Sequence, residues 1–476
     1  MCLKVNPEHY FVLHNGKVIK DLNELVQSLK TIDRKTFEYH VNDSKNDFAN
    51  WIRYVFKSNR LAETIADRGF EDIKIIIELI EKHLDELKIL VANGGSSSLK
   101  FQLLEFSSRN ILMKGMIDAI NLDRCNITLT FNGETTTKNV SVKNHDDAVA
   151  LMIKSLLDND IIGDISEIRA VGHRVVHGGE TYTEPVVIDN TVIEKLKELS
   201  SLAPLHNPAN ISCIQACMKT FTCPHVAVFD TAFHSTMPIE KFLYGLPYEY
   251  YEKYKIRKYG FHGSSHKYIA GLITEYYRIE GKKSSKIIIC HLGNGCSIAA
   301  VKNGKSINTT MGFTPLDGLI MGTRCGHLDP AIIAHLGAIL NLNYEQMSKI
   351  LNKQSGLLGI SGYSDMRDLR RTEHEEKSKL AMKMFSDRVT HYIGAYIAEM
   401  NGVDGIIFTA GIGENAFSIR KMVLENFEYL GLKLDNKKNE KNEFIISDKD
   451  SPITVFVMPT NEELQIATET KKVLKL

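Results

Sequence analysis

The sequence predicts an α/β protein in which a small, mostly helical N-terminal domain precedes a duplicated body. From Leu87 onward, short β-rich runs alternate with helical stretches, as is typical of α/β folds. Two similar apolar hairpins, at residues 89–104 and 287–301, open the two halves of this body. Residues 1–87 show helical periodicity instead. The two hairpins therefore predict that one architecture is repeated after the N-terminal domain.

The N-terminal domain carries three stripes of apolar residues at helical spacing. They run from Leu22 to Leu29, from Phe48 to Phe56 and from Ile73 to Leu87. Trp51, the only tryptophan of the chain, lies in the second stripe and is expected in the core of this domain. The segment shows no catalytic pattern, so regulation, docking of an unidentified partner and simple stabilisation all stay open.

The body is predicted element by element from its apolar runs. The predicted strands include residues 170–176, 225–229, 286–291 and 405–409. The predicted helices include residues 193–201, 268–278, 330–340 and 377–400. Asn303-Gly304 is a strong two-residue turn signal, so the second hairpin is expected to continue beyond it. The polar stretch 435–449 is expected to be a surface excursion.

Length and charge narrow the functional classes. With 476 residues the chain is long enough for several domains. Its 58 Lys and Arg balance its 58 Asp and Glu, which argues against partners such as nucleic acid or an anionic membrane. No apolar run is long enough to span a bilayer and no signal-peptide pattern is recognisable, so a cytoplasmic protein is expected.

Each hairpin joins its strands by a tight turn rich in Asn, Gly and Ser. The turns are Asn93–Ser98 and Gly293–Cys296. Glycine lets the backbone approach a phosphate closely, while turn N–H groups and Ser hydroxyls can donate to its oxygens. The pair therefore predicts that the two halves grip nucleotide phosphates from both sides of a cleft.

Two further segments resemble nucleotide motifs. Gly304-Lys305-Ser306 resembles the end of a P-loop, but Ala299 occupies the position of its first glycine. Gly411–Ala416 has the G-x-G-x-x-A spacing of a dinucleotide-binding fingerprint, with Asp435 about 20 residues further on. The same segment would equally serve a ribose and an α-phosphate at a helix N-terminus, so a dehydrogenase is the weaker reading.

Five charged or titratable residues lie at positions typical of a ligand site. Arg174 precedes a Gly-Gly turn and Arg324 has glycines on both sides, and two guanidinium forks suit a phosphoryl group and a carboxylate. Asp230 ends an apolar strand, where a carboxylate often orients a nucleophile or holds Mg²⁺. His262 lies in a glycine-bracketed loop. Glu462 follows the last strand, where it could also simply support the final helix.

The eight cysteines are scattered, which fits reduced and buried thiols. One cluster contains Cys213 and Cys217 on one helix face, followed by Cys223 and His225. A zinc knuckle usually has C-x2-4-C spacing with a matching second pair. The looser spacing here favours core packing over a structural metal.

Taken in order along the chain, these motifs resemble the acetokinase family over residues 88–473. The resemblance implies the two-lobed, actin-like ATPase fold with duplicated ribonuclease-H-like domains. It implies one lobe formed by residues 88–232 and 463–476 and another formed by residues 233–462. It also implies a homodimer and Mg²⁺-dependent, reversible transfer of the ATP γ-phosphoryl group to acetate, with Mn²⁺ as a possible replacement and ADP and acetyl phosphate as products.

The resemblance also implies a role for individual residues. The catalytic residues would be Arg174, His206, Asp230, His262 and Arg324. The nucleotide would be bound by Ser96, Ser98, Lys100, Gly293, Asn294, Gly295, Asp365, Arg367, Gly411, Gly413 and Asn415. The carboxylate substrate would contact Arg174, Val176, Leu205, Phe261 and Pro315. The Mg²⁺ site would be formed by Asn93 and Glu462.

The chain departs from the family pattern near these residues. Gly94 stands where the family usually has Ala, while Asp317, Cys325 and His327 stand where it commonly has Glu, Ser and Asp. The last three lie beside Arg324, so they could change the acyl preference. Propionate and butyrate are therefore alternative substrates, and a nucleotide-binding regulator is the alternative of a different class. The intact set of catalytic residues favours the enzyme.

Overall fold

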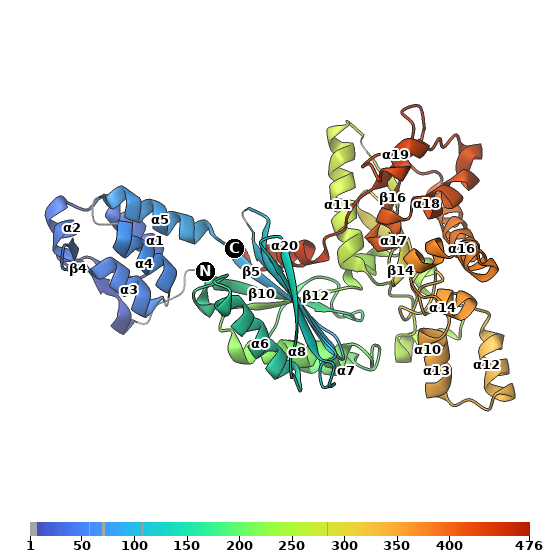
Figure 1. Cartoon of the computed structure of the whole chain (residues 1–476), viewed down its shortest axis with the longest axis horizontal. Coiled ribbons are helices and arrows are strands. Elements are labelled where there is room, and N and C mark those ends of the chain that lie inside the picture. The colour runs from blue at the N-terminus through green and yellow to red at the C-terminus, as the bar shows by residue number, and fades with distance from the viewer. Residues whose placement is uncertain (1–6, 57, 69–71, 107, 283) are drawn as a thin grey trace. The chain divides into compact units, whose positions relative to one another are not determined.

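The computed structural model describes residues 7–56, 58–68, 72–106, 108–282 and 284–476 (Figure 1). The chain divides into two units. Unit 1 comprises residues 1–175, 185–228 and 466–476, and unit 2 comprises residues 176–184 and 229–465. No described helix combines the length and the apolarity that a membrane crossing requires.

The N-terminal domain of unit 1 is a helical bundle with two very short hairpins. Its helices are α1 (Leu22–Leu29), α2 (Arg34–His40), α3 (Asp47–Val55), α4 (Asn59–Arg68) and α5 (Ile73–Asp85). The hairpins pair β1 (Phe11–Val12) with β2 (Val18–Ile19) and β3 (Val41–Asn42) with β4 (Lys45–Asn46).

The three predicted apolar stripes become α1, α3 and α5, and they face one hydrophobic core. Asp21, Asn46 and Asp72 cap the N-termini of these helices by accepting hydrogen bonds from backbone N–H groups. Trp51 is buried in this core as expected, and its indole N–H donates to the carbonyl of His9.

The body of unit 1 is built on an eight-stranded sheet in the order β11-β12-β10-β5-β6-β7-β8-β9. Its strands are β5 (Lys88–Gly94), β6 (Ser98–Glu105), β7 (Asn110–Asp118), β8 (Asn126–Phe131), β9 (Glu134–Asn139), β10 (Ile168–Val175), β11 (Val186–Val187) and β12 (His225–Phe229). Strands β5 to β9 form an antiparallel meander, whereas β10 pairs with β5 in parallel. Its helices are α6 (His145–Asp158), α7 (Asn190–Leu199) and α8 (Asn207–Thr220), of which α8 packs on β5 and β10.

Unit 2 is built on a five-stranded sheet in the order β15-β14-β13-β16-β17. Its strands are β13 (Lys286–Leu292), β14 (Cys296–Lys302), β15 (Lys305–Thr309), β16 (Gly405–Thr409) and β17 (Thr454–Val457). Again three strands form an antiparallel meander, and the next strand, β16, pairs with the first in parallel. The repeated strand pattern confirms the predicted duplication.

The helices of unit 2 are α9 (Ile239–Phe242), α10 (Tyr248–Tyr254), α11 (Gly263–Ile279), α12 (Pro330–Ile339), α13 (Tyr344–Lys353), α14 (Gly356–Ser361), α15 (Met366–Arg371), α16 (Glu376–Met400), α17 (Ala410–Asn415), α18 (Phe417–Leu424) and α19 (Asn436–Glu440). Of these, α11 packs on one face of the second sheet, and α16 and α18 pack on the other. Alternate side chains of β13 enter two different cores. Ile287 and Ile289 pack with α11, whereas Ile288 and Cys290 pack with α16 and α18. The last helix, α20 (Glu462–Leu474), begins in unit 2 and ends in unit 1.

Two segments late in the chain are more structured than their sequence patterns indicate. Gly411–Asn415 is itself helical, because β16 leads directly into the short helix α17. A Cβ at Gly413 would lie 3.3 Å from the carbonyl carbon of Phe408, so glycine allows this helix to fold back on its strand. The stretch 435–449 is more than a surface excursion, since it forms α19 and buries Asn439 and Ile446.

Candidate active site

His262 lies at the start of α11 in a left-handed conformation, with φ of 57°. The next residue must be glycine, because a Cβ at Gly263 would lie 2.1 Å from the carbonyl oxygen of Asp230. The Gly263 N–H donates to that same oxygen over 2.9 Å. Asp230, which directly follows β12 and is buried, is thereby held beside the His262 loop. Unit 2 thus brings together two of the predicted catalytic residues.

A buried hydrogen-bond relay orients the His262 ring. The Ser297 hydroxyl lies 2.9 Å from His262 Nδ1 and 2.7 Å from His266 Nε2. His266 Nδ1 is buried without a partner, and an orphaned acceptor there is easier to tolerate than an orphaned N–H. His266 Nε2–H then donates to Ser297, and Ser297 donates to His262 Nδ1. This assignment leaves the proton of His262 on Nε2, where it can be donated.

A second histidine fixes the backbone before His262. His234 Nε2–H donates to the carbonyl of Phe261 over 3.0 Å, and His234 Nδ1 accepts from the Ser306 hydroxyl over 2.8 Å. Burial lowers the pKa of His234 to about 4, so this ring is neutral at neutral pH. Because both of its nitrogens are occupied, His234 acts on the site only by holding the loop.

The turn of the second hairpin meets His262 and Arg324. A Cβ at Gly295 would lie 3.2 Å from His262 Nε2 and 3.5 Å from Arg324 Nη1. Glycine therefore leaves space in front of both donor groups. Arg324 Nη1 also donates to the carbonyl of Pro315 over 3.3 Å, and burial lowers the pKa of this guanidinium. The imidazole N–H of His262 and the mostly buried guanidinium of Arg324 thus both lie beside the turn of the second hairpin at Gly295.

Two of the departures from the family pattern contact each other beside this place. Asp317 Oδ1 lies 3.8 Å from His327 Nδ1. The backbone N–H of His327 also donates to the carbonyl of Gly318 over 3.0 Å. Asp317 and His327 therefore form a local pair on the loop that carries Arg324.

The segments predicted to hold the nucleoside also lie together in unit 2. A Cβ at Gly322 would lie 2.7 Å from Asn294 Oδ1 and 2.9 Å from the carbonyl oxygen of Ser364. Arg370 Nη1 donates to the carbonyl of Asn415 over 3.1 Å and so links α15 to the end of α17. The second hairpin, the start of α15 and α17 are therefore neighbours.

Asp365 and Arg367, both predicted to contact adenosine, are engaged with each other. The Arg367 guanidinium binds Asp365 through Nη2 at 2.7 Å and through Nε at 3.0 Å. The side chain of Arg367 is 88% exposed, so the pair lies at the surface and can exchange its partners.

Arg420 is a structural residue that sequence reasoning missed. It is fully buried in α18 and donates to the carbonyls of Gly413 and Glu414 over 2.8 and 2.9 Å. It also binds Asn439 of α19 through two hydrogen bonds. Arg420 therefore holds α17 in place. The one signal in the sequence was the helical spacing that puts this arginine on the same face as Val423.

The first hairpin belongs to unit 1. Asn93 of β5 pairs with Lys100 of β6, and the turn between the strands exposes Ser96. Ser98 begins β6, and its carbonyl accepts from the N–H of Gly95 over 2.7 Å. The predicted phosphate-binding residues of this hairpin thus surround one turn.

The structure gives a reason for Gly94. A Cβ there would lie 2.3 Å from the Cβ of Cys213, which projects from α8. Asn210 of the same helix donates to the Gly94 carbonyl over 2.6 Å. The Cys213 side chain therefore occupies the space that an alanine methyl at position 94 would need.

The remaining predicted site residues divide between the units. Unit 1 carries Arg174 at the end of β10, the 67% exposed Leu205, and His206 at the N-terminus of α8. In unit 2, Val176 and Phe261 belong to one hydrophobic core. Unit 2 also carries Gly293, Gly411 and Glu462. Gly293 neighbours Ala410, the first residue of α17, and a Cβ at Gly411 would meet no heavy atom within 4 Å. Glu462 is the first residue of α20.

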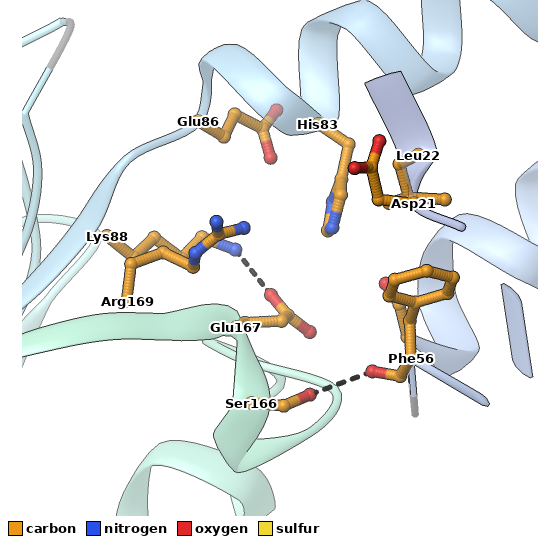
Figure 2. Close-up of a pocket in the computed structure, with 10 residues that line it drawn as sticks. Asp21, Leu22, Phe56, His83, Glu86, Lys88, Ser166, Glu167 and Arg169 are labelled. Carbon is orange, nitrogen blue, oxygen red and sulfur yellow. Dashed lines mark hydrogen bonds and ion pairs between the residues drawn. The ribbon is translucent and has the colours of Figure 1, made fainter. Parts of the chain in front are cut away.

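A pocket in unit 1 lies where the N-terminal domain meets the sheet (Figure 2). It is lined by Asp21, Leu22, Phe56, Ser58, His83, Glu86, Lys88, Ser166, Glu167 and Arg169. Lys88 and Glu167 form a buried ion pair, and the Ser166 hydroxyl donates to the carbonyl of Phe56 over 3.1 Å. Burial lowers the pKa of His83. This junction lies at the start of β5, the strand that ends in the first hairpin.

Comparisons with known proteins give one result for the body. A family model described as the acetokinase family matches residues 88–468. An acetate kinase of Thermoanaerobacterium thermosaccharolyticum is 52% identical over 398 residues, which cover 82% of this chain and 99% of the relative. An acetate kinase of Carboxydothermus hydrogenoformans is 50% identical over 394 residues, covering 81% and 98%.

Solved structures agree with these relatives. The acetate kinase of Porphyromonas gingivalis is 41% identical with a TM-score of 0.78, and the match covers 82% of this chain and all of that one. A propionate kinase of Francisella tularensis is 42% identical with a TM-score of 0.77, and the match covers 81% of this chain and all of that one.

Proposed function

This chain belongs to the acetokinase family, and on that premise we propose how its residues transfer a phosphoryl group from ATP to acetate. The chain is a kinase whose acceptor is the carboxyl group of acetate, as its relatives at about half identity over four fifths of the chain indicate. The fold is the actin-like ATPase fold of its structural neighbours. The geometry around His262 supports the roles that we propose for individual residues in that reaction.

The convergence of His262, Gly295 and Arg324 is the observation that carries the assignment. Phosphoryl transfer passes through a loose transition state whose charge spreads over the equatorial oxygens. His262 Nε2–H and the Arg324 guanidinium would donate to those oxygens. Arg174 and His206 of unit 1 would add a second cation and a second imidazole. Positioned donors of this kind typically contribute a factor of about 10²–10³ each to the rate.

The acceptor needs no general base. A carboxylic acid with an ordinary pKa of about 4 is ionised at neutral pH, so acetate is already a nucleophile. Direct in-line displacement without a phosphorylated enzyme is therefore the simplest route. Asp230, held beside His262 by the Gly263 N–H, would orient either acetate or the metal ion.

The two hairpins would bind the ATP phosphates through glycine backbones and Ser, Lys and Asn side chains. The residues concerned are Ser96, Ser98, Lys100, Gly293, Asn294 and Gly295. The neighbouring α15 and α17 would hold the nucleoside through Asp365, Arg367, Gly411, Gly413 and Asn415.

A hard divalent cation fits the donors proposed for it. Asn93 and Glu462 offer an amide and a carboxylate oxygen, which are the ligands that Mg²⁺ prefers. When bound, Mg²⁺, or Mn²⁺ in its place, would neutralise charge on the phosphates.

Propionate is the second candidate substrate, because one structural neighbour at 42% identity is a propionate kinase. The acyl group would contact Val176, Phe261, Pro315 and Leu205. One methylene in such a pocket changes the transition-state free energy by only about 1–3 kcal/mol, so both acids can react at different rates.

The decisive experiment measures acyl-hydroxamate formation from ATP, Mg²⁺ and hydroxylamine with acetate, propionate or butyrate. We expect acetate to give the highest kcat/KM and Arg324→Ala to lower it about 10²–10³-fold. Arg278→Ala, which removes an exposed arginine of α11, is the matched control. ATP binding without any product from the three acids would contradict the kinase and favour a nucleotide-binding regulator.

The family membership also leads us to propose a cytoplasmic homodimer. Sedimentation equilibrium of the full chain tests the dimer, for which we expect twice the 53.7 kDa of the monomer. A mass that stays at the monomer value across the concentration range would exclude it.

A further inference from the structure

Two buried cysteines of α8 face a histidine of the neighbouring strand β10. One ligand atom each from Cys213, Cys217 and His173 lie within 4.8 Å of one another, and all three residues are buried. The cysteine spacing by itself favours core packing. His173 lies far from these cysteines in the sequence, and only the packing of α8 on β10 brings it to them.

The hydrogen-bond pattern determines which nitrogen of His173 carries a proton. His225 Nε2 lies 3.4 Å from the carbonyl oxygen of Phe221, which can only accept, so this nitrogen is the protonated one. A neutral imidazole carries a single proton, on one of its two ring nitrogens. His225 Nδ1 therefore accepts, and the 2.9 Å bond between the rings is donated by His173 Nε2–H.

His173 Nδ1 consequently presents a bare lone pair. It is buried and has no hydrogen-bond partner. A ligand that binds this atom replaces the hydration that the atom loses on burial, and so stabilises the fold. A metal ion is a natural partner, because histidine ligands typically donate their other ring N–H to an acceptor, as His173 does to His225.

The donor set selects a thiophilic divalent cation. Thiolate and imidazole are the ligands of zinc sites. Zn²⁺ with two thiolates and one neutral imidazole has no net charge, which suits a fully buried position.

We propose that His173 Nδ1, Cys213 Sγ and Cys217 Sγ form a zinc-binding site between α8 and β10. On binding, the two thiol S–H bonds break, two Zn–S bonds form and two protons pass to the solvent. The same helix contacts the first hairpin through Asn210 and through Cys213 itself, which lies against Gly94. A bound zinc ion would thus brace α8 directly beneath the first hairpin.

The test measures metal content and not activity. The full chain is purified from cells grown with added zinc, and zinc is measured by mass spectrometry of the elements. We expect about one zinc per chain, lost in Cys217→Ala and in Cys213→Ala/Cys217→Ala. Cys125→Ala, which changes a buried cysteine of the same core, is the matched control and should keep the metal. Circular dichroism verifies that each variant is folded.

A second measurement needs no variant. The metal-free full chain is titrated with Co²⁺ and with Zn²⁺, and we expect a thiolate-to-cobalt charge-transfer band and two protons released per zinc ion. A folded chain that takes up neither ion, or that releases no protons, overturns the site. Equal zinc content in the wild-type chain and in the folded double variant also overturns it, because the metal would then lie elsewhere.

Discussion

At the scale of single residues, His262 shows how the surroundings maintain a strained backbone. Its left-handed conformation costs a residue other than glycine about 1–3 kcal/mol. The ring bond to Ser297 and the backbone bond from Gly263 to Asp230 offset that cost. Backbone strain of this kind concentrates at functional sites, which agrees with the proposed role of His262 as a donor to the phosphoryl group.

The relay predicts that Ser297 acts only through His262. We expect His262→Ala to lower kcat about 10²–10³-fold and Ser297→Ala to lower it less, with KM for ATP little changed in both. Steady-state kinetics of the two variants and of the double variant test this in a double-mutant cycle. Once His262 is absent, Ser297→Ala should have almost no further effect. Fully additive losses would show that Ser297 acts independently.

At the scale of elements, α11 contains two glycines with different surroundings, Gly263 at its first position and Gly271 in its middle. A Cβ at Gly263 would meet the Asp230 carbonyl, whereas a Cβ at Gly271 has no heavy atom within 4 Å. We expect Gly263→Ala to lower both stability and kinase activity. Gly271→Ala should raise the free energy of unfolding by up to about 1 kcal/mol, since alanine favours a helix. Urea unfolding gives the free energy of unfolding of both variants. Equal changes in the two would contradict the close approach of Gly263 to the Asp230 carbonyl.

The junction at the start of β5 depends on a buried ion pair. Lys88→Met removes the cation and leaves Glu167 with the hydrogen bonds from the N–H groups of Gly163 and Asp164. We expect it to lower the free energy of unfolding by about 3–5 kcal/mol, because it strands a buried carboxylate.

The control for Lys88→Met is an exposed pair of the same unit. Lys219→Met breaks the ion pair with Asp146 and should cost at most about 1 kcal/mol. Chemical denaturation measures both variants. Losses of equal size would show that burial does not strengthen the Lys88–Glu167 pair.

At the scale of the whole molecule, buried histidines make stability depend on pH. Burial lowers the pKa of several histidines, among them His173, His177, His225, His234 and His266. These rings are neutral in both states above pH 6.5. Below it the unfolded chain takes up protons that the native state does not, so stability falls as the pH falls from 6.5 towards about 4.

His234→Gln tests this dependence. The variant should lose less stability than the wild type between pH 6.5 and about 4, by on the order of 3 kcal/mol for a pKa lowered over that range. Free energies of unfolding measured across this range give the two slopes. Parallel slopes would mean that His234 titrates normally in the native state.

The N-terminal domain has no counterpart in the matched part of the relatives, because 82% of this chain covers 99% of an acetate kinase. A chain that begins at Lys88 should therefore fold and keep most of its kinase activity. Its free energy of unfolding should be lower than that of the full chain, because removing the N-terminal domain exposes the Lys88–Glu167 ion pair to solvent. Activity and thermal unfolding of the truncated chain check both points, and an inactive but folded product would assign a catalytic role to the domain.

Elements whose causes are local could be predicted from the order of the residues alone. The turn residues Asn93–Ser98 and Asn303-Gly304 and the apolar stripes of the N-terminal helices predicted hairpins and helices that the structure contains. The motifs around Arg174, His262 and Arg324 were long enough to identify the family. Neighbouring residues decide turn chemistry and periodicity, so a single sequence shows them.

Contacts between residues that are distant in the sequence depend on how the elements pack in three dimensions. The relay from His266 through Ser297 to His262, the Arg420 bonds that hold α17, and the approach of His173 to the α8 cysteines each join residues from different elements. Nothing in the spacing along the chain marks these contacts, because they depend on how helices pack on the two sheets. Packing of the hydrophobic cores fixes these contacts. The contacts in turn fix the tautomers and the burial of the histidines at the site.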